Sequence, residues 1–115
     1  MVAKGFAQKP GIDYTDMYAP VACMESTRFL LHVGASLDWE IHQMDVKTVF
    51  LHADLEEEVF MEQLEGMKEP GKEDWVCYMH KTLYGLMQAA CAWNLCLHHA
   101  MLEIGYVCIS VDHCI

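Results

Sequence analysis

The chain has 115 residues, of which 54% are hydrophobic and 21% are charged. This composition excludes intrinsic disorder, and the length allows one domain at most. Seven lysines and arginines against seventeen aspartates and glutamates give a formal net charge of -10, so the chain lacks the basic surface with which nucleic-acid-binding proteins attract phosphates.

The first predicted elements lie between residues 25 and 46. Apolar residues recur at helical spacing over residues 25–37, and Ser26 or Thr27 could cap the start of this helix. Residues 39–46 mix apolar and polar side chains with a two-residue alternation, which predicts a strand with one covered face. Asp45 would then lie near the end of that strand.

A hairpin is predicted next. An acidic run at residues 54–58 leads into a strand at residues 59–61, and the partner strand is expected at residues 75–79. The Pro70-Gly71 turn lies between them, but the connection is longer than a two-residue turn, so the register is left open. The three glutamates at residues 56–58 are interpreted as a solvated edge.

A second helix is predicted over residues 88–103, with Gly105 as its stop. Its apolar stripe consists of Ala89, Trp93, Leu97, Ala100 and Met101. Residues 106–109 would return as a strand. Together these elements predict an α+β domain over residues 1–115, in which two helices pack on a small, mainly antiparallel sheet.

The cysteines and the apolar stretches indicate where in the cell the protein is expected and whether it enters a membrane. Six cysteines lie scattered through apolar segments with no signal peptide before them, so we expect reduced thiols in an intracellular protein whose compartment is not specified. The stretch at residues 29–37 is interrupted by His32 and is shorter than the ~20 residues that a membrane span needs. We therefore expect no membrane partner.

Several motifs follow one another in a fixed order along nearly the whole chain. The motifs are Val-Ala-Lys-Gly-Phe-Ala-Gln (residues 2–8), Gly-Ile-Asp-Tyr (11–14), Tyr-Ala-Pro-Val-Ala (18–22), Glu-Ile-His-Gln-Met-Asp-Val-Lys-Thr-Val-Phe-Leu (40–51), Glu-Glu-Val-Phe-Met-Glu-Gln (57–63), Pro-Gly-Lys-Glu-Asp (70–74), Leu-Tyr-Gly-Leu (83–86) and Leu-Glu-Ile-Gly-Tyr (102–106). Their order, more than any single motif, resembles the copia-type (Pseudoviridae-like) LTR retrotransposon reverse transcriptases.

The resemblance implies a nucleotidyltransferase, an RNA-directed DNA polymerase that acts on an RNA or DNA primer-template and deoxynucleotides. The chain would cover part of the fingers and the first part of the palm domain. Asp45 matches a catalytic carboxylate that binds Mg²⁺, or Mn²⁺ in its place, in a two-metal mechanism. The backbone carbonyl of Val46 matches a second metal contact. Phe50 matches the ring that excludes a ribose 2′-hydroxyl, and Tyr84 and Gly85 match the start of the segment that supports the nucleotide.

The sequence also departs from the family. The Tyr-Val-Asp-Asp motif, which holds the other two catalytic carboxylates, does not occur, so we expect Asp45 to be vestigial and the chain to be inactive alone. Cys23 stands where arginine is common, Met87 where lysine is common, and Ala90-Cys91 where Pro-Arg is common. These changes remove positive charge, so we expect primer-template binding to be weak or absent.

Other interpretations stay open beside these. Asp45 could be an ordinary strand-end carboxylate, and Phe50 could be a core residue. The cysteines and histidines at positions 91, 96, 98 and 99 are zinc-ligand types, but their spacing does not place them on one helix face. The alternative function is a small protein-interaction module that associates with itself or a partner through an exposed apolar face and an unpaired sheet edge.

Overall fold

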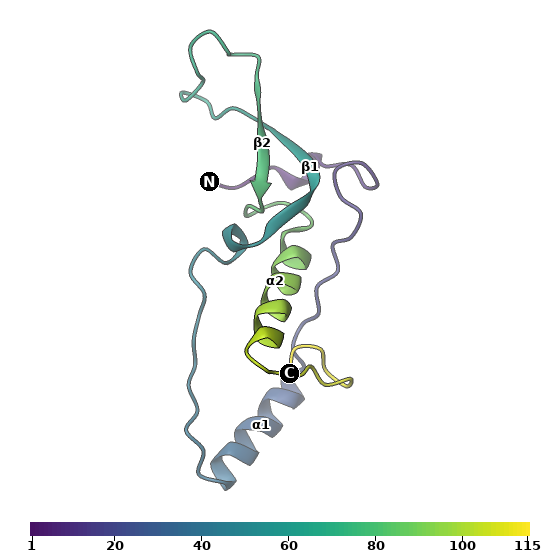
Figure 1. The fold of residues 1–115 in the computed structure, drawn as a ribbon, viewed down its shortest axis with the longest axis vertical. Coiled ribbons are helices and arrows are strands. Elements are labelled where there is room, and N and C mark those ends of the chain that lie inside the picture. Colours follow the sequence, from purple (N-terminus) through teal and green to yellow (C-terminus); the bar gives the residue numbers. More distant parts are fainter.

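The computed structural model describes residues 1–115 and shows an elongated α+β chain (Figure 1). Its extents are 65 × 28 × 25 Å and its radius of gyration is 18.6 Å, whereas a compact chain of this length has a radius of about 13 Å. The elements, in order, are the 3₁₀ helix η1 (Gly5–Ala7), the helix α1 (Met24–Ser36), the 3₁₀ helix η2 (Val49–His52), the strands β1 (Asp54–Glu62) and β2 (Val76–Lys81), and the helix α2 (Ala89–Glu103).

The strands β1 and β2 form the predicted antiparallel hairpin. Val59 pairs with Met79 and Glu62 pairs with Val76, with an irregularity in the pairing between Asp54 and Val59. The acidic run forms the first half of β1 instead of preceding it. Burial alternates along the strand, with Val59 inside and its neighbours more exposed, as the two-residue period of a strand requires.

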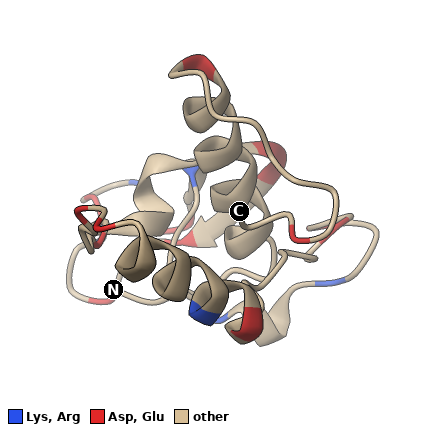
Figure 2. Cartoon of the chain, turned by 90° about the horizontal axis from the view of Figure 1, so that it is seen from below, with Lys and Arg blue, Asp and Glu red and all other residues tan.

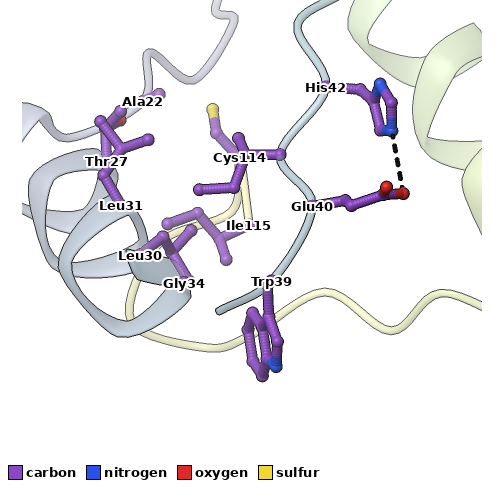
Figure 3. Close-up of a pocket in the computed structure, with 11 residues that line it drawn as sticks. Ala22, Thr27, Leu30, Leu31, Gly34, Trp39, Glu40, His42, Cys114 and Ile115 are labelled. Atoms are coloured by element: carbon purple, nitrogen blue, oxygen red, sulfur yellow. Dashed lines mark ion pairs between the residues drawn. The ribbon is translucent and has the colours of Figure 1, made fainter. Parts of the chain in front are cut away.

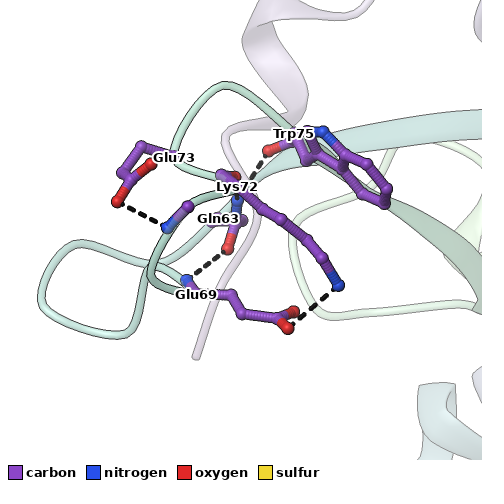
Figure 4. A network of polar contacts seen from close by, with 6 residues as sticks. Gln63, Glu69, Lys72, Glu73 and Trp75 are labelled. Carbon is purple, nitrogen blue, oxygen red and sulfur yellow. Dashed lines mark hydrogen bonds and ion pairs between the residues drawn. The ribbon is translucent and has the colours of Figure 1, made fainter.

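The long connection between the strands is organised by one side chain (Figure 4). The Gln63 amide nitrogen donates to the carbonyls of Lys72 at 2.6 Å and Trp75 at 2.9 Å, and its oxygen accepts from the Glu69 amide at 2.9 Å. The Lys72 ammonium lies 2.9 Å from the Glu69 carboxylate and 4.9 Å from the centroid of the Trp75 ring. These contacts close a loop that a two-residue turn could not span.

The small core lies where α2 begins. Its buried residues come from the start of α2, the two strands' inner ends and the amino-terminal segment, which makes it a junction of distant parts of the chain. Its members include Tyr14, Ala53, Val59, Thr82, Leu83, Gln88 and Ala89. The helix α2 packs against η2 and β1 at this point. Its bounds confirm the second predicted helix, residues 88–103, to within one residue.

The helix α1 confirms the first predicted helix, but its start is capped differently from the prediction. Ser26 and Thr27 lie inside the helix, and Cys23 is the residue at its N-cap. The Cys23 amide instead donates to the Asp112 carboxylate at 3.0 Å, and so does the Cys114 amide. Hydrogen bonds from Cys114, Cys23 and Ser26 lower the pKa of Asp112, because they stabilise its charged form.

Three expectations about the fold are wrong. Residues 39–46 and 106–109 form no strand, and α1 does not pack on the sheet. A strand exists only where a neighbour supplies the other half of the hydrogen-bond ladder, and the sheet consists of β1 and β2 alone. The alternating residues 39–46 are therefore an extended, exposed segment that returns from α1 to the hairpin (Figure 1). Neither helix is long and apolar enough to cross a membrane.

Candidate functional site at the junction of η2, the hairpin and α2

Thr82, directly after β2, joins the hairpin to η2. Its side chain is completely buried, its amide donates to the Ala53 carbonyl at 3.0 Å, and its hydroxyl donates to the Phe50 carbonyl. Both acceptors belong to η2 or to the residue that follows it. Thr82 therefore determines where η2 lies relative to the end of the hairpin.

Phe50 and Tyr84 meet at this junction. Their ring centroids are 4.7 Å apart with an angle of 68° between the ring planes, an edge-to-face arrangement that aromatic pairs favour. Two of the residues that the sequence assigned to a nucleotide site are therefore in contact, although they are far apart along the chain. Phe50 is half-buried and Tyr84 is 38% exposed, so the pair lies at the surface of the core.

Gly85, beside Tyr84, allows the amino-terminal segment to approach. It adopts a φ of 97°, and a Cβ atom there would collide with the carbonyl oxygen of Ala3. The Ala3 amide donates to the Tyr84 carbonyl at 2.7 Å. A Cβ atom at Gly5 would in turn collide with the carbonyl of Gly85. The two glycines are needed because two backbones touch here.

Two glutamines complete the junction. The Gln8 side chain donates to the Gln88 side-chain oxygen at 3.1 Å and accepts from the Met87 amide at 2.9 Å. The Gln88 side chain is buried and donates to the Asp13 carbonyl at 3.0 Å. Sequence reasoning missed Thr82, Gln8 and Gln88, because no local pattern marks a polar side chain whose partner is distant in the chain.

Asp45 and Val46 lie apart from these contacts. Both are exposed in the extended segment before η2, and Asp45 makes no hydrogen bond or ion pair. The chain contains no group of three or more histidines, cysteines, aspartates or glutamates that could hold a metal ion. One exposed carboxylate does not fit the near-octahedral set of oxygen ligands that Mg²⁺ requires. The residues that raised the zinc interpretation, including Cys91 and His98, form no such group either.

The surface near the junction is acidic. A groove of about 570 Å³ between β1 and α2 is lined by Asp16, Asp54, Glu56, Glu57 and Glu103. Burial, with the charges of Asp16 and Glu57, raises the pKa of the Cys91 thiol at its edge. The Lys81 ammonium lies 2.7 Å from the Asp54 carboxylate, so one of the few cations here is already paired. Such a groove repels phosphates.

Comparison with known proteins decides the family. A family model described as reverse transcriptase (RNA-dependent DNA polymerase) matches residues 1–115. The chain belongs to this reverse transcriptase family. The resemblance that the ordered motifs indicated is thereby confirmed.

The curated relatives are retrotransposon polyproteins. The retrovirus-related Pol polyprotein from transposon TNT 1-94 of Nicotiana tabacum is 47% identical over 115 residues, which are 100% of this chain and 9% of that protein. The retrovirus-related Pol polyproteins from transposons RE2 and RE1 of Arabidopsis thaliana are each 40% identical over 107 residues, which are 93% of this chain and 7% of each protein. This reverse transcriptase chain thus spans less than a tenth of each of these three polyproteins. No solved structure matches it.

Proposed function

We propose that the chain is the part of a copia-type reverse transcriptase, from the fingers and the first part of the palm, that holds the incoming deoxynucleotide. The observation that carries this proposal is the contact between Phe50 and Tyr84, held in place by Thr82. In this arrangement the Phe50 ring excludes a ribose 2′-hydroxyl, and Tyr84 and Gly85 begin the segment that supports the nucleotide.

We also propose that the chain does not polymerise DNA alone. Asp45 is its one residue that matches a catalytic carboxylate, and no second carboxylate is grouped with it. Divalent metals supply the charge stabilisation for in-line displacement when two ions are bound, and this chain does not provide their ligands. Asp45 is therefore a vestigial or contributing ligand that needs carboxylates from further polypeptide.

The acidic surface is the reason why we propose that this chain binds a primer-template weakly or not at all. Residues 54–74 contain nine carboxylates and two lysines, a net charge of -7 out of the total of -10. Each missing basic contact also reduces the counterion release that favours nucleic-acid binding. An intracellular location remains part of the proposal, and the six free thiols are consistent with it.

The test is deoxynucleotide incorporation on an RNA template with a DNA primer, in Mg²⁺ or Mn²⁺. The chain alone and its Asp45→Asn variant should both give none. In a chimera, this chain replaces the matching segment of the tobacco polyprotein, and the unmodified polyprotein is the control. The chimera should incorporate deoxynucleotides, Asp45→Asn should abolish incorporation, and Phe50→Ala should increase incorporation of ribonucleotides.

Two results would contradict the proposal. Incorporation by the isolated chain that depends on Asp45 would show that it needs no further carboxylates. An inactive chimera beside an active control polyprotein would show that this segment no longer supports the nucleotide site.

A further inference from the structure

The amino-terminal segment, residues 1–15, contacts the turn that lies directly before α2 (Figure 1). The Ala3 amide donates to the Tyr84 carbonyl, and a Cβ atom at Gly5 would collide with the Gly85 carbonyl. The Gln8 side chain extends this contact to the residues that follow Gly85. Distant parts of the chain therefore meet at the two residues that begin the nucleotide-supporting segment.

Neither ion pairs nor apolar packing account for the attachment of residues 1–8. The chain has seven basic and seventeen acidic residues (Figure 2), and its three ion pairs all lie between residues 40 and 81. The apolar cleft of about 470 Å³ along α1 is lined from within residues 22–42 and from residues 114–115 (Figure 3). Val2 and Phe6 are 71% and 82% exposed. Hydrogen bonds therefore hold residues 1–8 on the turn.

The hydrogen bonds of two glutamines run in one direction. The Met87 amide can only donate, so the Gln8 side-chain oxygen accepts from it at 2.9 Å and the Gln8 nitrogen faces Gln88. The Asp13 carbonyl can only accept, so the Gln88 nitrogen donates to it at 3.0 Å and the Gln88 oxygen accepts from Gln8 at 3.1 Å. Each position therefore needs a side chain that donates and accepts at once, which an ionised carboxylate cannot do.

The turn depends on these outside contacts for its position. Within residues 83–88, one backbone hydrogen bond joins the Leu86 amide to the Leu83 carbonyl at 3.2 Å. Gly85 has no side chain to restrict its backbone. Gln88 is 2% exposed and Gln8 is half-buried, so water competes little for their hydrogen bonds, and a buried partner left unpaired is costly.

We propose that Gln8 is a positioning residue for the nucleotide site. Its amide holds the turn at Tyr84 and Gly85 where these residues support the deoxynucleotide, and this inference rests on the proposed function of the chain. Gln8 acts through the turn and does not touch the nucleotide. Without its hydrogen bonds the turn adopts the binding position for a smaller fraction of the time, and the apparent affinity for the nucleotide falls by that fraction.

The test uses the chimera with the tobacco polyprotein and measures KM and kcat for deoxynucleotide incorporation at saturating primer-template. Gln8→Glu keeps the acceptor for the Met87 amide but places an oxygen against the Gln88 oxygen. We expect KM for the deoxynucleotide to rise roughly tenfold, which corresponds to one lost hydrogen bond of about 1.4 kcal/mol. The kcat should stay close to that of the unmodified chimera, because the variant changes binding and not the chemical step.

Gln63→Glu is the matched control. The Gln63 amide also donates to backbone carbonyls and accepts from a backbone amide, but it lies in the loop between β1 and β2. This variant removes the same kind of donor away from the site and should leave KM unchanged. Circular dichroism of the isolated chain verifies that both variants keep their helices. If Gln8→Glu loses them, Gln8→Met removes the same donor without adding a charge and replaces it with the same expectation.

The possible results separate this inference from the proposed function. An active chimera whose KM is unchanged by the Gln8 variant would overturn the positioning role and leave the proposed function standing. A fall in kcat at constant KM would show that Gln8 only supports the fold, and an equal rise in KM from Gln63→Glu would show a general loss of stability. Either result overturns the inference. An inactive chimera beside an active control polyprotein would overturn the proposed function, and this inference with it.

Discussion

The buried hydroxyl of Thr82 offers a direct test of how the candidate site is held together. Replacing Thr82 by valine keeps the branched shape of the side chain and removes only the donor to the Phe50 carbonyl. Thr82 is completely buried, so the variant leaves the Phe50 carbonyl without its protein donor. An unsatisfied buried polar group costs about 1–3 kcal/mol. Phe50 is only half-buried, so its carbonyl can recover some hydration, and we expect a loss of about 1–2 kcal/mol.

Thr82→Ser provides the matched comparison. Serine keeps the hydroxyl and removes one methyl group, which costs about 0.8 kcal/mol per buried carbon. The valine variant therefore measures the contribution of the hydrogen bond to stability, and the serine variant measures the contribution of the buried methyl group. If the hydrogen bond matters for the site, the valine variant also loses the edge-to-face contact between Phe50 and Tyr84, and the serine variant keeps it.

Urea unfolding, followed by tryptophan fluorescence at low protein concentration, measures the free energies. Nuclear Overhauser effects between the two rings report their contact directly. The reasoning is refuted if Thr82→Val is as stable as wild type and keeps the ring contact. A loss of stability with the ring contact intact would show that Thr82 supports the fold without positioning Phe50.

Two further predictions concern the backbone contact and the helix cap. Gly85→Ala should lower the thermal unfolding midpoint more than Gly66→Ala, because both glycines have positive φ but only Gly85 faces another backbone, at Ala3. Equal shifts would rule out the close contact. The pKa of Asp112 is lowered in the folded chain, so the cap on α1 should be fully present above the ordinary carboxyl pKa and be lost as the pH falls through the lowered value. Hydrogen exchange at the Cys23 amide measures this loss, and Asp112→Asn should abolish its dependence on carboxyl titration.

The elements that depend on local pattern could be predicted from the sequence. The apolar period along α1 and α2 and the alternation in the hairpin state which residues share a face, and these patterns need no knowledge of distant residues. The family could be predicted for a similar reason, since the ordered motifs are a property of the chain itself. The rings of Phe50 and Tyr84 are in contact, but their roles at a nucleotide site, which the family resemblance implied, stay a prediction.

Tertiary structure decided what depends on partners distant in the chain. Residues 39–46 have a strand-like alternation but find no neighbouring strand, so the alternation has no ladder to support it. The start of α1 is capped by Asp112, 89 residues away from Cys23, and no local motif could reveal that. Thr82 became a site residue only when folding buried its hydroxyl against η2. Local sequence thus determined the two long helices, the hairpin and the family, whereas long-range hydrogen bonds and burial decided which residues meet and which strand-like segments form strands.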